Sequence, residues 1–183
     1  MLIDRGGYKN PPPRRFVLLV ASMLVSVSAY ASDWRFYMGD DNEISFYSAS
    51  DLARDGNNVR VWIQVYGAKE FKKFLEKKPP ETIQKAVDRV KAGYRPPYAE
   101  HFNLDADQAT GIAVLEEVAN EQVAPVKQRT LEEFDCAGGR FRVLQFSSFK
   151  PGPEATITVP QSWTYIAPDT VGATLKSWVC TRS

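Results

Sequence analysis

Cysteine and histidine are the residues that this sequence has least of, and their scarcity excludes most common catalytic and metal-binding motifs. The 183 residues include two cysteines, Cys136 and Cys180, and one histidine, His101. A cysteine nucleophile needs a base, most often histidine, and a third group that orients the base. The three residues also lack the close spacing of structural zinc ligands. We therefore expect no enzymatic activity, no metal site and no cofactor, and we expect His101 to lie in a solvated loop.

Long hydrophobic runs are also missing, since a membrane helix needs about 20 apolar residues. The apolar run Phe16–Ser28 is shorter, follows two arginines and precedes "AYA". This layout is typical of a secretory signal peptide, although a retained membrane anchor is the alternative. We expect cleavage of residues 1–31, which leaves residues 32–183 as a single periplasmic or secreted domain without an integral membrane segment. No cysteine stands directly after the expected cleavage site, and the first one in the chain is Cys136, so we expect no lipid anchor.

A strong excess of one charge is absent as well. Removal of residues 1–31 takes away four of the 23 basic and one of the 22 acidic residues, which leaves 19 and 21 and a net charge of −2. A general nucleic-acid binder carries a basic surface, which this composition does not supply. The remaining length is sufficient for one domain with a hydrophobic core. Nucleic acid is therefore not an expected partner.

The two cysteines are most simply explained as one disulfide bond, because an exported protein folds in an oxidising compartment. Closing the loop between Cys136 and Cys180, 44 residues apart, stabilises a chain by about 4 kcal/mol in the chain-entropy model. Cys180 follows a short apolar helical face formed by Val171, Leu175 and Trp178. The bond would hold this terminal helix, capped by the residue at 169 or 170, against a strand turn.

Short segments rich in aromatic and β-branched residues predict strands on both sides of a helical region. They are residues 34–38, 44–49, 59–66, 127–135, 140–149, 155–159 and 162–166. The segment 59–66 alternates, so that its aliphatic residues form one face. The other face carries Arg60, Trp62, Gln64 and Tyr66. This second face is either covered by a helix, for which the terminal helix with Trp178 is the obvious choice, or is a binding surface.

Residues 67–125 have helical composition and predict an insertion into the sheet. Pro80 suits the first position of a helix that ends near Gly93, and a second helix is expected over about 105–121. Asp105 and Gln108 have the spacing of a capping box, and Ile112, Leu115 and Ala119 would face the domain. The basic run at residues 69–78 is expected to be a solvated helix face.

The segment "GYRPPYAEHF", residues 93–102, connects these helices and mixes aromatic residues with two prolines. Rigid exposed aromatic side chains make good anchors for a partner protein, but they could equally fold back over the helices. The candidate binding surface therefore combines residues of this segment, the mixed strand face and the terminal helix: Arg60, Trp62, Tyr66, Tyr94, Tyr98 and Trp178.

Four separated pieces together resemble the surface-adhesin protein E-like domain of Gram-negative bacteria. They are Trp34, "ISFYSASDLARDGNNVRVWIQV", "EEFDCAGGRFRVLQF" and "SWTYIAPDTVGATLKSWVC", and they lie within residues 33–66 and 127–180. The resemblance implies an α+β fold with an antiparallel sheet and a C-terminal helix held on it by the Cys136–Cys180 disulfide. We expect about six strands, with the helical insertion added.

The resemblance also implies a function in binding, because the founding member of the family is an adhesin that binds host matrix and plasma proteins and can dimerise. We expect an envelope or host matrix protein as the partner, and a homodimer is compatible with the resemblance. That adhesin is lipid-anchored, whereas this chain lacks the required cysteine, and the insertion at 67–125 is a second departure. A periplasmic carrier of small molecules or lipids, or an envelope hydrolase, is the alternative function.

Overall fold

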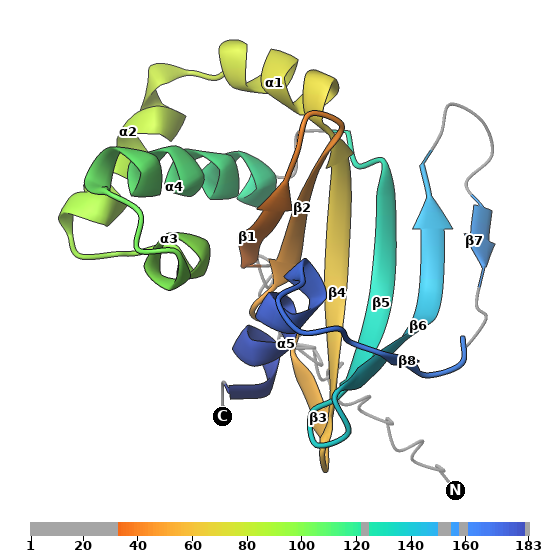
Figure 1. Ribbon diagram of the computed structural model, residues 1–183. Coiled ribbons are helices and arrows are strands. Elements are labelled where there is room, and N and C mark those ends of the chain that lie inside the picture. Colours follow the sequence, from red (N-terminus) through yellow and green to blue (C-terminus); the bar gives the residue numbers. More distant parts are fainter. Residues whose placement is uncertain (1–32, 122–124, 150–154, 158–160, 182–183) are drawn as a thin grey trace, which may run out of the picture. The chain divides into compact units, whose positions relative to one another are not determined.

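The computed structural model describes residues 33–121, 125–149, 155–157 and 161–181. These residues form one antiparallel sheet with helices beside it and across one face (Figure 1). The expected signal peptide, residues 1–31, lies outside the described residues. No helix among the described residues is long and apolar enough to cross a membrane.

The sheet has the order β1-β2-β4-β5-β6-β7, with the short strand β3 added beside β4 and β8 beside β6. All strand pairs are antiparallel, and the six-strand path confirms the fold class expected from the sequence. Strand β3, which follows the turn-prone Ser-Ala-Ser segment, was not predicted. The strands are β1 Trp34–Gly39, β2 Glu43–Ser48, β3 Ala53–Asp55, β4 Asn58–Gly67, β5 Gln128–Asp135, β6 Arg140–Ser148, β7 Ala155–Ile157 and β8 Thr164–Tyr165.

Five helices accompany the sheet: α1 Ala68–Glu76, α2 Pro80–Lys91, α3 Pro97–His101, α4 Ala106–Asn120 and α5 Val171–Thr181. The capping box at the start of α4 is present, with Asp105 and Gln108 bonding to each other's backbone. Helix α3 is a correction, because the sequence placed His101 in a loop. A pair of prolines ends one helix and also suits the first turn of the next, and Pro97 is the first residue of α3.

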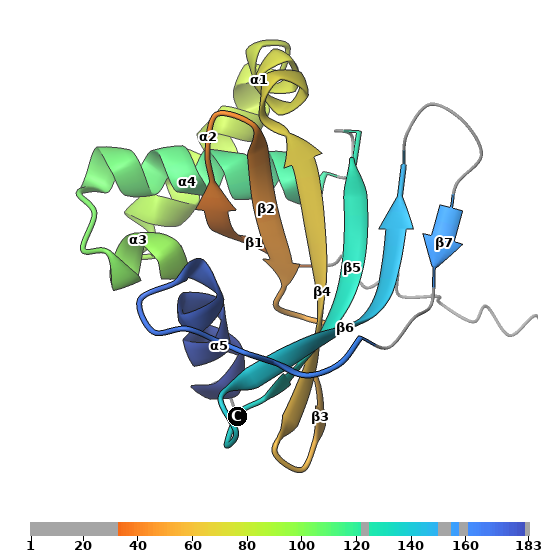
Figure 2. The same ribbon diagram turned by 45° about the vertical axis from the view of Figure 1, so that its right-hand side comes forward.

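Helix α5 covers the aliphatic face of β4, where Leu175 and Val179 pack with Val59, Val61 and Ile63. The sequence suggested that α5 would cover the mixed face carrying Arg60 and Trp62, so the structure corrects this expectation. The physical reason is that an apolar helix stripe buries more apolar surface against an all-aliphatic strand face. Figures 1 and 2 show α5 lying across this face of the sheet.

Helices α2 to α4 group beside β1, on the side of the sheet away from β5 and β6, and α1 lies over the ends of β2 and β4 (Figure 2). Phe71 of α1 and Val118 and Ala119 of α4 are buried in one cluster with aromatic residues of the sheet. Phe46 contacts the rings of Phe36, Tyr66 and Phe71 at centroid distances of 5.6–5.9 Å. The domain therefore has two apolar clusters, one under α5 and one shared with α1 and α4.

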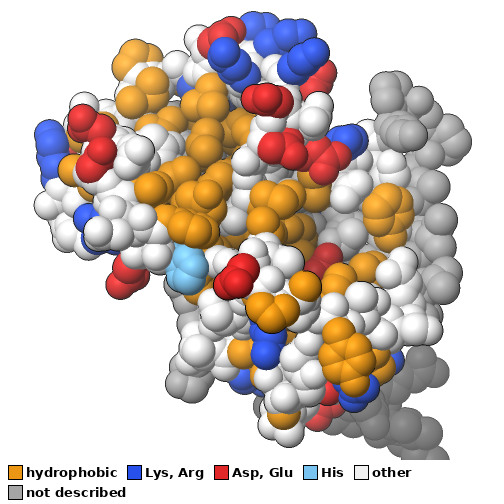
Figure 3. Space-filling model, viewed as in Figure 1, with side chains coloured by type: hydrophobic (Ala, Val, Ile, Leu, Met, Phe, Trp, Pro, Cys, Tyr) orange, Lys and Arg blue, Asp and Glu red, His pale blue; other side chains and the backbone are white. Residues whose placement is uncertain are grey.

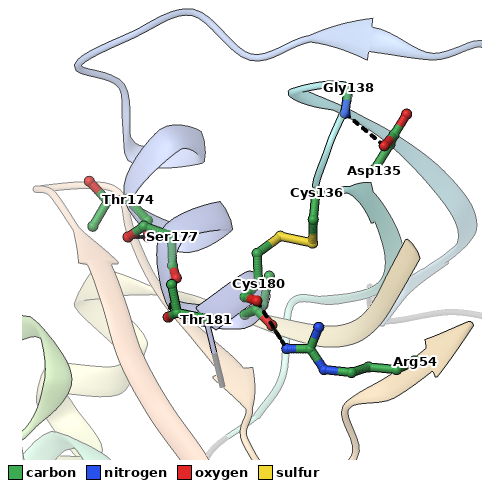
Figure 4. The surroundings of a disulfide bond; sticks show 9 residues. Arg54, Asp135, Cys136, Gly138, Thr174, Ser177, Cys180 and Thr181 are labelled. Carbon is green, nitrogen blue, oxygen red and sulfur yellow. Dashed lines mark hydrogen bonds between the residues drawn. A yellow bond between two sulfur atoms is a disulfide. The ribbon is translucent and has the colours of Figure 1, made fainter. Parts of the chain in front are cut away.

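The disulfide between Cys136 and Cys180 is formed, with 5.7 Å between the two Cα atoms (Figure 4). Cys136 lies in the tight turn between β5 and β6, where Gly139 adopts a left-handed backbone with φ of +65°. Arg54 of β3 donates hydrogen bonds to the carbonyl oxygens of Val179 and Cys180, at 2.8 and 3.2 Å. The end of α5 is thus fixed by one covalent bond and by one arginine.

Candidate functional site

Strand β1 forms one wall of the candidate site, and its position is fixed by side chains of α4. Asn120 accepts a hydrogen bond from the Trp34 N–H at 2.7 Å and donates to the Trp34 carbonyl oxygen at 3.2 Å. Glu116 accepts from the Phe36 N–H at 3.2 Å. Three backbone groups at the start of this edge strand, the N–H and carbonyl of Trp34 and the N–H of Phe36, are therefore paired with α4 rather than with another strand.

Glu116 also bonds to the polar side chains of Tyr94 and Arg35 beside β1. Its buried carboxylate accepts from the Tyr94 hydroxyl at 2.5 Å and pairs with Arg35 at 3.3 Å. Arg35 bonds Tyr94 and lies 2.6 Å from Asp33, and its guanidinium stacks over the Tyr94 ring. Burial raises the pKa of Tyr94, and the neighbouring carboxylate of Glu116 raises it further. This network anchors the segment that leads into α3.

Helix α3 packs onto β1 and α5 through aromatic rings. Tyr98 contacts Phe36 at 4.8 Å, Phe102 at 4.6 Å and Trp178 at 6.4 Å between ring centroids. The imidazole of His101 meets the Trp178 ring edge-on at 5.7 Å. Edge-to-face packing of this kind favours a defined arrangement of the rings. The segment at 93–102 therefore both folds back, through Tyr98, and presents side chains outward.

A cleft of about 370 Å³ lies between β1, α3 and the start of α5, and we call it the α3–α5 cleft. Its lining residues come from all three elements: Tyr37, Met38, Gly39, Tyr98, His101, Phe102, Asp169, Thr170, Val171 and Thr174. Figure 3 shows hydrophobic side chains gathered over β1 and the helices beside it. The Thr170 hydroxyl accepts from the Ala173 N–H at 3.3 Å, which identifies the residue that caps α5.

Two walls of the α3–α5 cleft carry large hydrophobic side chains in contact with solvent. Phe102 is 48% exposed and Val171 is 43% exposed, and they belong to a small set of large hydrophobic residues with this much exposure. Exposed apolar groups that flank one concave site are typical of an interaction surface. The polar side chains among the described residues that line the cleft carry hydroxyls, one imidazole and the carboxylate of Asp169.

The structure divides the six residues of the candidate binding surface among four places. Tyr98 lines the α3–α5 cleft and packs against Trp178, and Tyr94 belongs to the Glu116 network. Tyr66 is only 1% exposed and is packed among the aromatic residues near α1. Trp62 is partly buried beside that cluster. Whether these residues bind a partner stays a prediction.

Arg60 is exposed, but it pairs with a carboxylate of the neighbouring strand. Glu133 is buried and lies 2.9 Å from Arg60 and 2.5 Å from Arg142. These partners lower the pKa of the Glu133 carboxyl, although burial acts in the opposite direction. The Arg142 guanidinium also stacks over the Trp163 ring at 4.5 Å. This group is explained as a structural ion-pair network on the face opposite α5.

Metal ligation finds no support in the part of the chain that the structure describes. No three histidine, cysteine, aspartate or glutamate side chains there are grouped closely enough to hold an ion. Both cysteines are consumed by the disulfide. The chemistry that the α3–α5 cleft offers is therefore apolar and aromatic contact with a few hydrogen-bonding groups.

Comparison with known proteins identifies the family of this chain. The model of the family described as surface-adhesin protein E matches residues 34–181, which include the sheet, the helices α1 to α5 and both cysteines. No curated protein and no solved structure matches the chain. The family is that of a surface adhesin, and the α3–α5 cleft offers apolar and aromatic contacts. The chain belongs to the surface-adhesin protein E family.

Proposed function

We propose that this chain is an exported, non-enzymatic binding protein of the bacterial envelope, and that it contacts a partner protein through the α3–α5 cleft. Membership of the surface-adhesin family supports binding in general. The observation that carries the choice of site is the exposure of Phe102 and Val171 on opposite walls of one aromatic cleft. Aromatic residues in such positions commonly dominate the binding free energy.

The partner is an envelope protein or a host matrix protein, in agreement with the adhesin family. The full chain would be expressed, and its exported form would be immobilised. An envelope extract and purified matrix proteins would then be passed over it. Wild type is compared with Phe102→Ser and with Ile83→Ser, because Ile83 is 42% exposed on α2 and does not line the cleft. We expect Phe102→Ser to weaken capture of the enriched partner at least tenfold and Ile83→Ser to leave it unchanged.

Two results would contradict the proposal. The first is that wild type enriches no partner from any source. The second is that a partner is enriched but is retained equally by Phe102→Ser. Near-identical unfolding midpoints for the three proteins would show that the substitutions act at the surface.

A small-molecule carrier is the second candidate, and the size of the cleft favours it. Its volume of about 370 Å³ lies in the range of about 300–1,000 Å³ that is usual for ligand sites. Native mass spectrometry of the exported protein would then show a co-purified ligand. Such a ligand should be lost on Phe102→Ser, whereas an adhesin without a carrier function would show the mass of the polypeptide alone.

A further inference from the structure

A second, smaller cavity lies between α5 and the sheet, and we call it the Glu132 pocket. Its volume is about 180 Å³, and it is lined by Tyr37, Met38, Glu132, Phe134, Phe141, Val171, Gly172 and Leu175. Tyr37, Met38 and Val171 also line the α3–α5 cleft, so the two hollows are neighbours that share walls from β1 and the first turn of α5. A partner seated on the cleft can therefore extend a side chain into the pocket.

Glu132 is the one acidic residue among the described residues that line this pocket, and its neighbours there are apolar or aromatic. The contrast with Glu133 is informative. Glu133 faces the other side of the sheet and is held by two arginines, whereas no lysine or arginine in the described part of the chain forms an ion pair with Glu132. A carboxylate in an apolar pocket without a cation is costly to maintain.

The pKa of the Glu132 carboxyl is consistent with its position in an apolar pocket without a cation among the described residues. Burial raises the pKa of Glu132 to about 7. Tyr37 of β1 is the other titratable residue facing the pocket, and α5 contributes only uncharged residues to its lining. His101 and Asp169 line the adjoining cleft. A cation that entered the pocket would favour the charged form of the carboxyl.

We propose that the Glu132 pocket receives a lysine side chain of the bound partner, with the ammonium group on the Glu132 carboxylate and the alkyl stem along Val171 and Leu175. The proposal rests on the function proposed above. Lysine suits this lining because its four-carbon stem can be buried while its charge is paired. The ring of Tyr37, which also lines the pocket, adds an aromatic surface that attracts an ammonium group.

Arginine suits the pocket less well. A guanidinium presents five N–H donors, and the lining supplies one carboxylate and one phenol hydroxyl as side-chain acceptors. An ammonium group has three donors and is the smaller head group. The pocket therefore distinguishes lysine from arginine as well as from a neutral apolar side chain.

The test uses the exported protein and three small probes that differ only in the head group: n-pentylamine, n-pentanol and n-pentylguanidine. Binding is followed by the shifts of backbone amide signals of Val171 to Leu175 in two-dimensional NMR spectra at pH 8. We expect the amine to bind at least tenfold more tightly than the alcohol and several-fold more tightly than the guanidine. Glu132→Gln should remove the preference for the amine while it leaves the weak affinity for the alcohol unchanged.

Two controls distinguish an ion pair between the amine and Glu132 from a general effect of negative charge on amine binding. Glu43→Gln removes an exposed carboxylate that does not line the pocket and should keep the wild-type preference. Lowering the pH from 8 to 5 should weaken amine binding about tenfold, since protonation removes the charge of Glu132 while the amine remains charged.

Equal affinity for amine and alcohol, or an amine preference that survives Glu132→Gln, would overturn the lysine proposal. Absence of binding of all three probes would also overturn it. These outcomes leave the proposed function testable on its own, because the capture experiment depends on Phe102 and uses no amine. Loss of capture on Phe102→Ser together with no amine preference would mean that the cleft binds a partner without the inserted lysine.

Discussion

The two sides of this domain are held together by different means. Helix α5 lies on an all-aliphatic strand face and is fixed by a covalent bond and by Arg54, and the one carboxylate beneath it lacks an ion-pair partner among the described residues. On the β1 side, α4 is fixed by Glu116 and Asn120, which bind backbone groups of the edge strand. An apolar helix such as α5 can be held by packing and by a few bonds at its end. A polar contact such as that of α4 with β1 is stable only when each buried polar group has a partner.

The largest expected effect comes from removing the covalent attachment of α5. Replacing both cysteines, Cys136→Ser and Cys180→Ser, should lower the free energy of unfolding by about 4 kcal/mol, because the unfolded chain is no longer closed into a loop. Urea denaturation monitored by tryptophan fluorescence measures the change. A loss below about 1 kcal/mol would mean that α5 is held by packing and by Arg54 alone.

The next largest effect is expected on the β1 side. Glu116→Ala removes the acceptor of the Phe36 N–H and the Tyr94 hydroxyl and leaves Arg35 with Asp33 as its carboxylate partner. We expect a loss of about 3 kcal/mol, because buried polar groups are left unpaired. Glu117→Ala on the same helix, which breaks a partly exposed pair with Arg89, is the matched control and should cost less than about 1 kcal/mol. Similar losses for the two variants would contradict the importance of the buried network.

A pH-dependent effect of intermediate size is expected under α5. Because the pKa of Glu132 is raised to about 7 in the folded protein, the native state binds a proton more tightly than the unfolded chain. Its contribution to stability is complete below the ordinary pKa of 4.5, falls as the pH rises towards 7, and is then constant. The full shift corresponds to roughly 3.4 kcal/mol, and we expect a loss on the order of 2 kcal/mol because the Glu132 side chain is partly exposed to solvent.

Glu132→Gln isolates this contribution. The variant cannot ionise, so its stability relative to wild type should rise between pH 4.5 and 7 and remain higher above pH 7. Thermal unfolding of the two proteins across this pH range measures the difference. A difference that is independent of pH would show that the carboxyl of Glu132 is ordinarily solvated.

The smallest effect is expected from Asn120→Ala. The variant loses the two hydrogen bonds to Trp34, but the backbone of this strand end is partly accessible to water. We expect a loss of about 1 kcal/mol, and hydrogen exchange should accelerate at the Trp34 amide while the amides of β4 remain protected. Faster exchange throughout β4 would mean that the contact supports the whole sheet.

Much of the fold was predictable because it depends on local patterns. Alternation identified β4, the capping box identified α4, and export together with two cysteines identified the disulfide. The sequence also placed Ile112, Leu115 and Ala119 on the inner face of α4, and all three pack in the aromatic cluster. These features can be predicted without knowing which distant segments of the chain are in contact.

The candidate site was less predictable because it depends on how distant segments meet. Glu116 interrupts the apolar stripe of α4, one turn after Ile112, and a charged residue in such a place was an available signal of a buried partner. Glu132 alternates with Thr130 and Phe134, so it shares their face of β5, but nothing local shows that α5 lies above it. The prolines before α3 were interpreted as a loop signal, which concealed the helix that carries His101 at its end.

The pairing of β1 with α4 has a consequence for assembly. A free edge strand can add a strand from another molecule and so start polymers or amyloid-like aggregates. Here Asn120 and Glu116 occupy the backbone groups of Trp34 and Phe36 that such an incoming strand would need. The β1 edge of the sheet can therefore lie beside an exposed aromatic cleft while these backbone groups are closed to an incoming strand.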